Sequence, residues 1–340
     1  MVANQRWYRV FLRPLSRKGI EGVFCFGKEM VSVIDKPMDI LQQFPVRKSR
    51  KQKEAFRDAV ASYARSQGYE VTVEKGSFGA RNVMIGDPKT ASYLVTAHYD
   101  TPASIGIPNL ITPCNFLFYL LWQLLIVAGL ILATIVAGFV VMLLTWNELL
   151  VFWTAYLCYF GLLGLMMFGP ANISNANDNT SGVVTLLETA RSMPEIHRSK
   201  VCFVLFDLEE AGLIGSASYR KSHKAESDKQ IIVNLDCVGD GDHIVFFPTK
   251  KLKKDMRKLN PLYTCCGQFG NKNITIRDKG FSVFPSDQKN FPYGVGIAAL
   301  KKGKLGLYMN RIHTKKDTVL EQTNVNILRS ALVTYITCTK

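Results

Sequence analysis

The sequence predicts an α/β domain with a largely parallel sheet, interrupted by two inserted transmembrane helices. Two patterns predict this fold. Short apolar runs typical of strands alternate with longer segments of helical periodicity, and this alternation favours a parallel sheet covered by helices. In the middle of the chain lie two long runs of almost entirely apolar residues, which is the composition of helices that cross a bilayer.

The amino-terminal part is expected to contain one helix and three strands. Residues 48–68 place Phe56, Val60 and Tyr63 at helical spacing and end at Gly68, which predicts a helix with a glycine stop. The segments that follow are rich in apolar and β-branched residues, and they predict three short strands within residues 69–76, 81–87 and 91–100.

The two apolar runs cover residues 116–144 and 149–168, and the sequence TWNE separates them. Only Gln123 and Thr134 interrupt the first run as clearly polar residues. At about 1.5 Å per residue, each run is long enough to cross a hydrocarbon core of about 30 Å. Two buried core helices are the alternative, but such helices show a polar face that both runs lack. We therefore expect a transmembrane hairpin.

Strand and helix patterns resume after the hairpin. A helix is expected to begin near Thr180 or Ser181, and a strand with the apolar core Phe203–Phe206 follows within residues 200–210. The remaining elements are a helix, two strands joined by a glycine-rich turn, and a final helix, within residues 211–223, 230–248 and 324–339. The expected organisation is one domain in two parts around the hairpin, with boundaries at residues 1–115, 116–168 and 169–340.

Charge and cysteine usage indicate the environment of the protein. The formal charge of +15 favours an anionic partner such as lipid headgroups, although a lysine-rich solvated surface explains it equally well, and no nucleic-acid partner is expected. The basic clusters RKSRKQK, KKLKKDMRK and KKGK are either solvated or pressed against anionic lipid. The eight cysteines include no C-x-x-C pair, which argues against a disulfide framework or a zinc knuckle and favours a reducing compartment.

The expected location is the cell membrane, with two spans and the larger domain in the cytoplasm. The first residues mix apolar and basic side chains without the apolar core of a signal peptide. Neither the sequence TWNE nor the segments that flank the hairpin carry Lys or Arg, so the positive-inside signal is weak. The cysteine usage and the missing signal peptide are the better guides to orientation.

Acidic and histidine residues gather where the expected strands and helices begin or end. These residues are His98 and Asp100 at one strand end, Glu209 and Glu210 after a second strand, Asp236 at a third, Asp178 before a helix, and His313 in the motif HTKKDT. Each has a structural explanation on its own, such as a helix N-cap. Together, at strand ends where open α/β sheets bind ligands, they form the nitrogen–oxygen ligand set of a zinc or cobalt pair. No H-E-x-x-H, G-x-S-x-G or P-loop motif is present.

The motifs AHYDT, NDNTSGV, LFDLEEAGLIGS, NLDCVG and HTKKDT, in this order, resemble those of metallopeptidase family 28, the di-zinc aminopeptidases. The resemblance covers residues 48–335 apart from the hairpin, and it implies a three-layer α/β/α fold around a mixed, mainly parallel sheet. It also implies two zinc ions per chain, one bound by His98, Asp178 and Asp236 and the other by Asp178, Glu210 and His313. In this family pattern Asp100 orients His98, Glu209 is the general base, and the Asp178–Asn179 peptide is cis.

The activity that the resemblance implies is that of a membrane-anchored zinc aminopeptidase. Glu209 would take a proton from the attacking water and pass it to the leaving amine. The expected partners are a peptide substrate and, through the hairpin, the lipid bilayer. Glutaminyl cyclases, carboxypeptidases and inactive receptors or scaffolds on the same scaffold remain alternatives, although the intact ligand set and base argue against an inactive protein. A transporter is disfavoured, because the two spans contain no buried charge.

Two features depart from the family pattern. Soluble relatives join the His–Asp motif to the bridging aspartate by a short loop, whereas here residues 101–177 intervene and contain the hairpin. Because only Gly169–Asn177 separate the second span from Asp178, the bridging ligand should lie within roughly 30 Å of the bilayer interface. We therefore expect the active site to border the membrane. The second departure is Ser286-Asp287-Gln288, where many relatives have S-D-H, and no chemistry is assigned to it.

Overall fold

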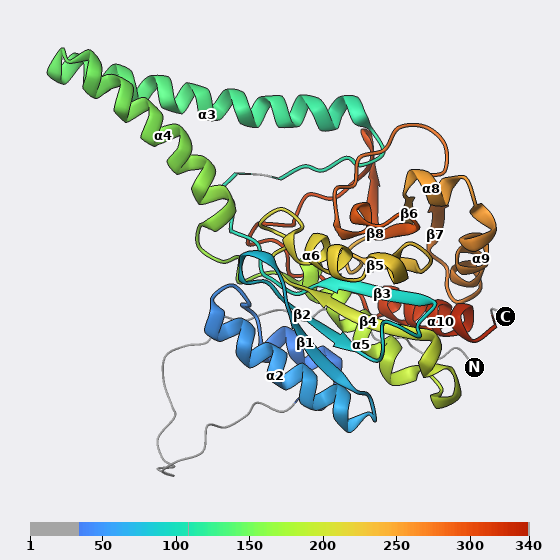
Figure 1. Ribbon diagram of the computed structural model, residues 1–340. Coiled ribbons are helices and arrows are strands. Elements are labelled where there is room, and N and C mark those ends of the chain that lie inside the picture. Colours follow the sequence, from blue (N-terminus) through green and yellow to red (C-terminus); the bar gives the residue numbers. More distant parts are fainter. Residues whose placement is uncertain (1–33, 108, 339–340) are drawn as a thin grey trace, which may run out of the picture.

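The computed structural model describes residues 34–107 and 109–338, which form one α/β domain with a projecting helical hairpin (Figure 1). The expectations for the amino-terminal 33 residues, for Cys25 and for Thr339 at the end of the final helix lie outside the described residues. The described cysteines are all unpaired thiols.

A single mixed sheet forms the centre of the domain. Its strand order is β1-β2-β4-β3-β5-β8-β6-β7, with β9 paired to β8. The central strands β4, β3, β5 and β8 are parallel, whereas β1, β2 and β6 run antiparallel to neighbours. The strands are β1 (Val71–Lys75), β2 (Arg81–Ile85), β3 (Tyr93–His98), β4 (Val201–Phe206), β5 (Ile231–Leu235), β6 (His243–Pro248), β7 (Asn273–Ile276), β8 (Gly294–Gly303) and β9 (Gly306–Tyr308).

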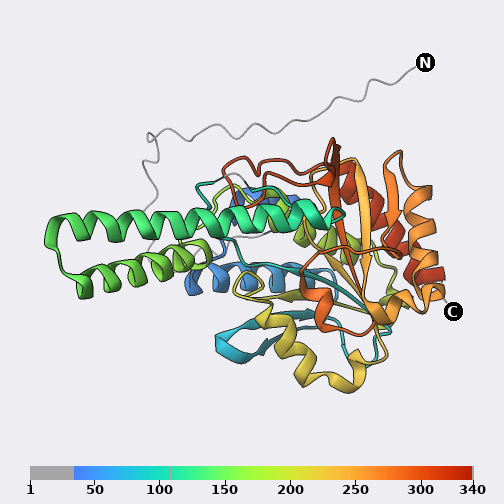
Figure 2. The same ribbon diagram turned by 90° about the horizontal axis from the view of Figure 1, so that it is seen from above.

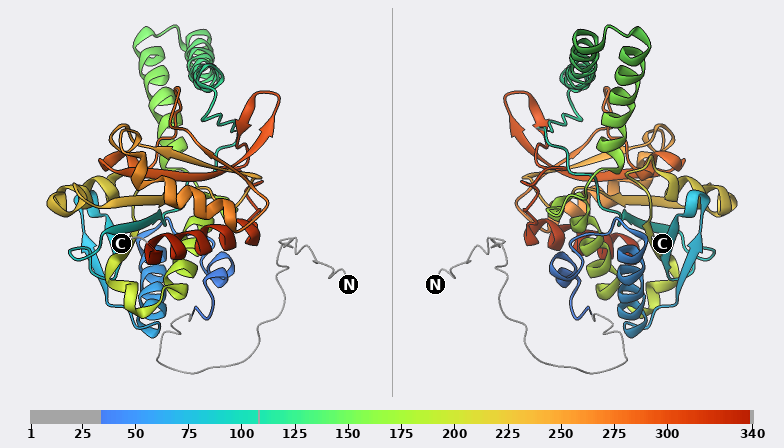
Figure 3. Two further views of the ribbon diagram at one scale, coloured as in Figure 1. Left: turned by 90° about the vertical axis from the view of Figure 1, so that its right-hand side faces the viewer. Right: turned by 90° about the vertical axis from the view of Figure 1, so that its left-hand side faces the viewer.

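Helices cover both faces of the sheet, which confirms the expected α/β fold. Alternate strand residues such as Val95 and Phe203 are buried on one face, against α2 (Arg50–Ser66), α5 (Gly182–Ser192) and α10 (Gln322–Cys338) (Figure 3). Leu94 and Val204 point to the other face and pack with Tyr219 of α6 (Ile214–Ser222). Burial on both faces explains why the strands appear in the sequence as continuous apolar runs. Shorter helices are α1 (Ile40–Gln43), α7 (Lys224–Ser227), α8 (Lys250–Lys253) and α9 (Asn260–Gln268).

The two apolar runs form the helices α3 (Phe116–Thr145) and α4 (Glu148–Phe168), which project together from the domain (Figures 1 and 2). Both are long and apolar enough to cross a membrane, and only 6% of the most apolar window of α3 and none of that of α4 is buried. The helices contact each other at Gly138, where an added Cβ would lie 3.4 Å from Val151. Their exposure argues against the alternative of two buried core helices.

Strands β7, β8 and β9 were not expected from the sequence. The central strand β8 contains Gly294, Gly296 and Gly303, and glycine weakens the strand signal. The structure explains Gly296, because an added Cβ would lie 2.7 Å from the side chain of Gln288. Helix α5 begins at Gly182, next to the expected start, whereas α6 begins at Ile214, later than expected.

Candidate metal centre

Three neighbouring parallel strands end at the same edge of the sheet and carry much of the acidic cluster. Strand β3 lies between β4 and β5, and His98, its last residue, is level with Phe206 at the end of β4. Asp236 directly follows β5, and Glu209 and Glu210 follow β4. The apolar strands therefore bring residues that are far apart in the sequence to one place.

Asp178 lies between two histidines. It enters from the helical turn Ala176–Ser181, which precedes α5, whereas His313 enters from the loop that follows β9. Asp178 Oδ1 lies 3.3 Å from His98 Nε2, and Asp178 Oδ2 lies 3.0 Å from His313 Nε2. A carboxylate that faces two imidazoles through its two oxygens has the arrangement of a bridging ligand in a two-metal site.

Two groups of potential metal ligands share Asp178. In the first group Asp236 Oδ1 lies 3.7 Å from His98 Nε2, and in the second Glu210 Oε2 lies 3.6 Å from His313 Nε2. Within each group the ligand atoms all lie within 4.8 Å of one another. The structure thus brings together the two sets of residues that the family resemblance implies.

Asp100 holds the backbone of the two glutamates. Its Oδ1 accepts the N–H of Glu209 at 3.1 Å, and its Oδ2 accepts the N–H of Glu210 at 3.2 Å. The same Oδ1 lies 3.5 Å from His98 Nδ1. Glu209 Oε2 faces the cluster 4.0 Å from His98 Nε2. Asp100 therefore holds the backbone of the Glu209–Glu210 pair and lies beside His98.

Further residues fix the turn that carries Asp178, and sequence reasoning did not find them. Asp317 accepts the backbone N–H groups of Asn177 and Asp178 at 2.8 and 3.0 Å. Asn179 Oδ1 accepts the N–H of Cys237, which joins the turn to the end of β5. The Asp178–Asn179 peptide is cis, as the resemblance implies. Asp317 and Asn179 belong to recognised motifs, but the sequence does not show which backbone groups they hold.

The cluster holds more buried carboxylates than the two histidines can neutralise. Burial raises the pKa of Glu209 and that of Glu210 well above the usual value, and neighbouring carboxylates add to the effect. Burial also acts to raise the pKa of Asp178, but hydrogen bonds and charge from His313 and His98 outweigh it and lower that pKa. Glu210 Oε1 is buried with no hydrogen-bond partner among the described residues. Divalent cations that prefer nitrogen and oxygen ligands, such as zinc, fit this donor set.

The Ser286-Asp287-Gln288 segment forms a buried polar layer beside the cluster. Asn234 of β5 donates to Ser286 Oγ at 2.8 Å, and Ser216 Oγ of α6 donates to Asp287 Oδ1 at 2.5 Å. Burial raises the pKa of Asp287 to about 7. The segment therefore joins β5 to α6 beside the cluster.

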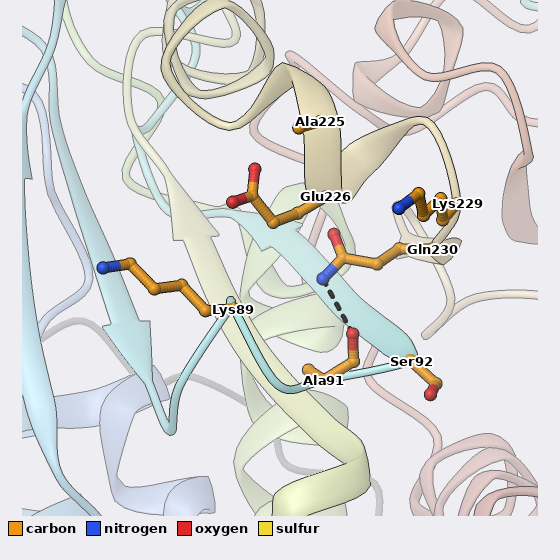
Figure 4. A pocket seen from close by; sticks show the side chains of 7 residues that line it. All are labelled: Lys89, Ala91, Ser92, Ala225, Glu226, Lys229 and Gln230. Carbon is orange, nitrogen blue, oxygen red and sulfur yellow. Dashed lines mark hydrogen bonds between the residues drawn. The ribbon is translucent and has the colours of Figure 1, made fainter.

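A surface hollow of about 430 Å³ lies at the opposite edge of the sheet (Figure 4). Its lining comes from the segments before β3 and β5, where Gln230 Nε2 donates to the Ala91 carbonyl at 2.8 Å. Because His98 and Asp236 lie at the carboxyl ends of these strands, the hollow is separate from the metal cluster.

Comparison with known proteins identifies the family of the chain. The model of peptidase family M28 matches residues 165–334, which is half of the chain. Aminopeptidase YwaD of Bacillus subtilis (strain 168) is 40% identical over 67 residues, which cover 19% of this chain and 15% of that protein. The match thus spans far less than two thirds of the relative.

Solved structures share the fold over most of the chain. A Zn-dependent exopeptidase from Parabacteroides distasonis has a TM-score of 0.59 at 16% identity, covering 90% of this chain and 98% of that one. The Legionella pneumophila LapA aminopeptidase has a TM-score of 0.54 at 13% identity, covering 89% and 71%. A Porphyromonas gingivalis glutaminyl cyclase has a TM-score of 0.57 at 17% identity, covering 89% and 97%.

Proposed function

This chain belongs to peptidase family M28, and we propose that it is a membrane-anchored aminopeptidase with two zinc ions. The observation that carries the proposal is the position of Asp178 between His98 and His313, with Asp236 and Glu210 completing two compact ligand groups. Zinc held by these residues would supply Lewis-acid polarisation of a peptide carbonyl and acidification of the attacking water.

Glu209 is the proposed general base. Its Oε2 faces the cluster beside His98, so it can take a proton from a water that attacks the substrate there and return it to the leaving amine. Burial raises the pKa of Glu209 above its usual value, and a carboxylate of raised basicity is a better proton acceptor. Asp100 contributes by fixing the backbone that carries Glu209.

The hairpin is the proposed membrane anchor, with the catalytic domain in the cytoplasm. The exposed apolar surfaces of α3 and α4 support insertion into a bilayer. Only Trp146 and Asn147 separate the two helices, so almost nothing would protrude on the far side. The unpaired thiols of the described cysteines fit a reducing compartment.

A glutaminyl cyclase is the second candidate, because solved cyclases share the fold as well as solved exopeptidases do. A carboxypeptidase on the same scaffold is the third. The three activities differ in their product, which is a freed N-terminal residue, ammonia or a freed C-terminal residue. Product analysis therefore separates them.

The test uses detergent-purified protein loaded with zinc and a panel of peptides with free or acetylated N-termini, followed by mass spectrometry. We expect single residues to be released from free N-termini only. Glu209→Gln should abolish release, whereas Glu226→Gln, which removes a carboxylate at the opposite edge of the sheet, should leave it unchanged. Ammonia or C-terminal residues would establish an alternative, and no product despite two bound zinc ions would contradict an enzymatic function.

A further inference from the structure

The hairpin leaves and re-enters the domain at loops that also form one side of the metal centre. We call these loops the hairpin base and define it as residues 103–107, 109–115, 169–175, 281–283 and 302–316. Ala103 and Ala171 form a β-bridge, and Ser104 donates its N–H to the Pro170 carbonyl at 2.8 Å. The chain therefore enters and leaves the hairpin side by side.

Hydrogen bonds connect the loops at the two ends of the hairpin to the loop of His313. Ile105 donates its N–H to the His313 carbonyl at 2.8 Å, and Asn172 Nδ2 donates to the Thr314 carbonyl at 3.1 Å. Asn172 is four residues beyond Phe168, the end of α4, and four residues span at most about 14 Å. His313 thus lies within about 25 Å of the end of α4, a limit that the sequence alone does not set.

The metal centre is most open on the side of the hairpin base. The side chain of His313 is 23% exposed, whereas the side chains of the other four candidate ligands are 1–14% exposed. His313 itself belongs to the hairpin base. A substrate that reaches the cluster past its most exposed ligand therefore approaches from the side of the bilayer.

The β8–β9 turn also belongs to the hairpin base. Asn115, which caps α3, donates to the Leu305 carbonyl at 3.1 Å, so the turn lies beside the first residues of α3. Figure 3 shows this turn and the hairpin on the same side of the domain. Lys302 near the end of β8 and Lys304 of the turn are exposed, as are Lys315 and Lys316 of the His313 loop.

Charge and apolar surface on the hairpin base match an anionic bilayer. The four lysines form no ion pair among the described residues, and the segments of the hairpin base contain no Asp or Glu. Ile107, Ile173 and Phe281 are large, are 45%, 70% and 65% exposed, and lie in the other segments of the hairpin base. The Phe281 ring lies 4.5 Å from that of Phe116 at the start of α3. Apolar side chains among lysines suit a lipid interface better than a nucleic acid.

We propose that the hairpin base rests on anionic lipid headgroups, so that the metal centre acts on peptides whose amino termini are held at the bilayer surface. The substrate part of this proposal rests on the proposed aminopeptidase function and on the hairpin anchor. Each lysine near an anionic surface strengthens the contact about fivefold, so four lysines form a substantial docking surface.

The docking surface is tested by hydrogen–deuterium exchange of the full chain in nanodiscs of phosphatidylcholine, with and without phosphatidylglycerol. We expect exchange in residues 302–306 and 311–317 to slow at least about tenfold when the anionic lipid is present. Replacing Lys302, Lys304, Lys315 and Lys316 by Gln should remove this protection. A matched control replaces Lys89, Lys229, Lys250 and Lys254, exposed at the opposite edge of the sheet, and should retain it. Equal exchange in both lipids, or protection by a DNA duplex alone, would overturn the docking surface.

The substrate class is tested in the same nanodiscs with one peptide sequence in two forms, one of them acylated on a lysine near its C-terminus. We expect N-terminal residues to be released at least tenfold faster from the acylated form, and the advantage to shrink in the quadruple Gln variant but not in its control. Equal rates for both forms would overturn the membrane-surface substrate. Failure to release residues from either form contradicts the aminopeptidase function instead, and the exchange experiment still decides the docking surface.

Discussion

Asp100→Asn is expected to weaken zinc binding while leaving the fold intact. Asp100 is 3% exposed, and its two oxygens accept the N–H groups of Glu209 and Glu210 while one of them also faces His98 Nδ1. Asparagine has nearly the same shape, but one oxygen becomes an amide NH₂ group. In either amide orientation, a donor then faces a backbone donor.

Two independent estimates give the size of the effect. A hydrogen bond to a charged acceptor contributes about 1.5–3 kcal/mol, which corresponds to about 10- to 150-fold in an equilibrium constant. Loss of a carboxylate that orients a metal-binding histidine typically costs about 10–100-fold in affinity. Zinc affinity should therefore fall about 10- to 100-fold in Asp100→Asn.

Competition with a fluorescent zinc chelator measures this affinity in detergent, and thermal unfolding of the metal-free proteins checks the fold. Asp58→Asn, an exposed position on α2, is the matched control. An affinity unchanged within threefold in a folded Asp100→Asn protein would refute the positioning role. An equal loss in the control variant would refute it as well.

Three further predictions concern the bridging carboxylate of Asp178, the buried ion pair of Lys53 and Asp207, and the buried carboxyl of Asp287. Asp178→Asn should lower bound zinc from two ions per chain to one or none, because both groups share this carboxylate; elemental analysis that still finds two ions would contradict the bridge. Lys53 Nζ lies 2.5 Å from Asp207 Oδ1, and both side chains are buried. Lys53→Met leaves the Asp207 charge buried without its partner, so denaturant titrations should show the free energy of unfolding lowered by about 3–5 kcal/mol. A loss below about 1 kcal/mol would be inconsistent with a buried ion pair. Burial raises the pKa of Asp287 from 3.8 to about 7. The protonated carboxyl therefore makes its full contribution to stability below about pH 4, and this contribution is lost as the pH rises through 7. In metal-free protein, stability should therefore fall less steeply with pH for Asp287→Asn than for the parent, and equal slopes would exclude the shift.

The parts of the fold that the sequence predicts are those whose local pattern and tertiary environment agree. Strands β3, β4 and β5 are buried on both faces, and this burial requires the continuous apolar runs that mark them in the sequence. Helix α2 has a capping box at Ser49 and Gln52. Strand β8 lacks such a signal, because Gly296 is needed for the close approach of Gln288, a contact that only the folded chain defines.

The same distinction holds for the metal centre. Its candidate ligands stand at strand ends in recognisable motifs, so their meeting at one edge of the sheet follows from the topology. The residues that fix the ligands act differently, since Asp317 binds the N–H of Asn177 from 140 positions away. No local pattern marks such a contact. The lysines of the hairpin base are a similar case, because the segments that flank the hairpin in sequence carry no Lys or Arg.

The hairpin lies between two motifs of the metal centre, yet its insertion need not disturb the ligands. Ala103 and Ala171 pair directly, so the ends of the inserted segment are as close together as the ends of a short loop would be. The turn that carries Asp178 is held beyond the point of re-entry by Asp317 and by contacts to the end of β5. The geometry of the ligands is thus set by the sheet and its loops, whereas the hairpin, as the proposed anchor, would set where the domain sits. The proposed anchor at this edge would place the open side of the cluster toward the bilayer, and an anchor at the opposite edge would place it away.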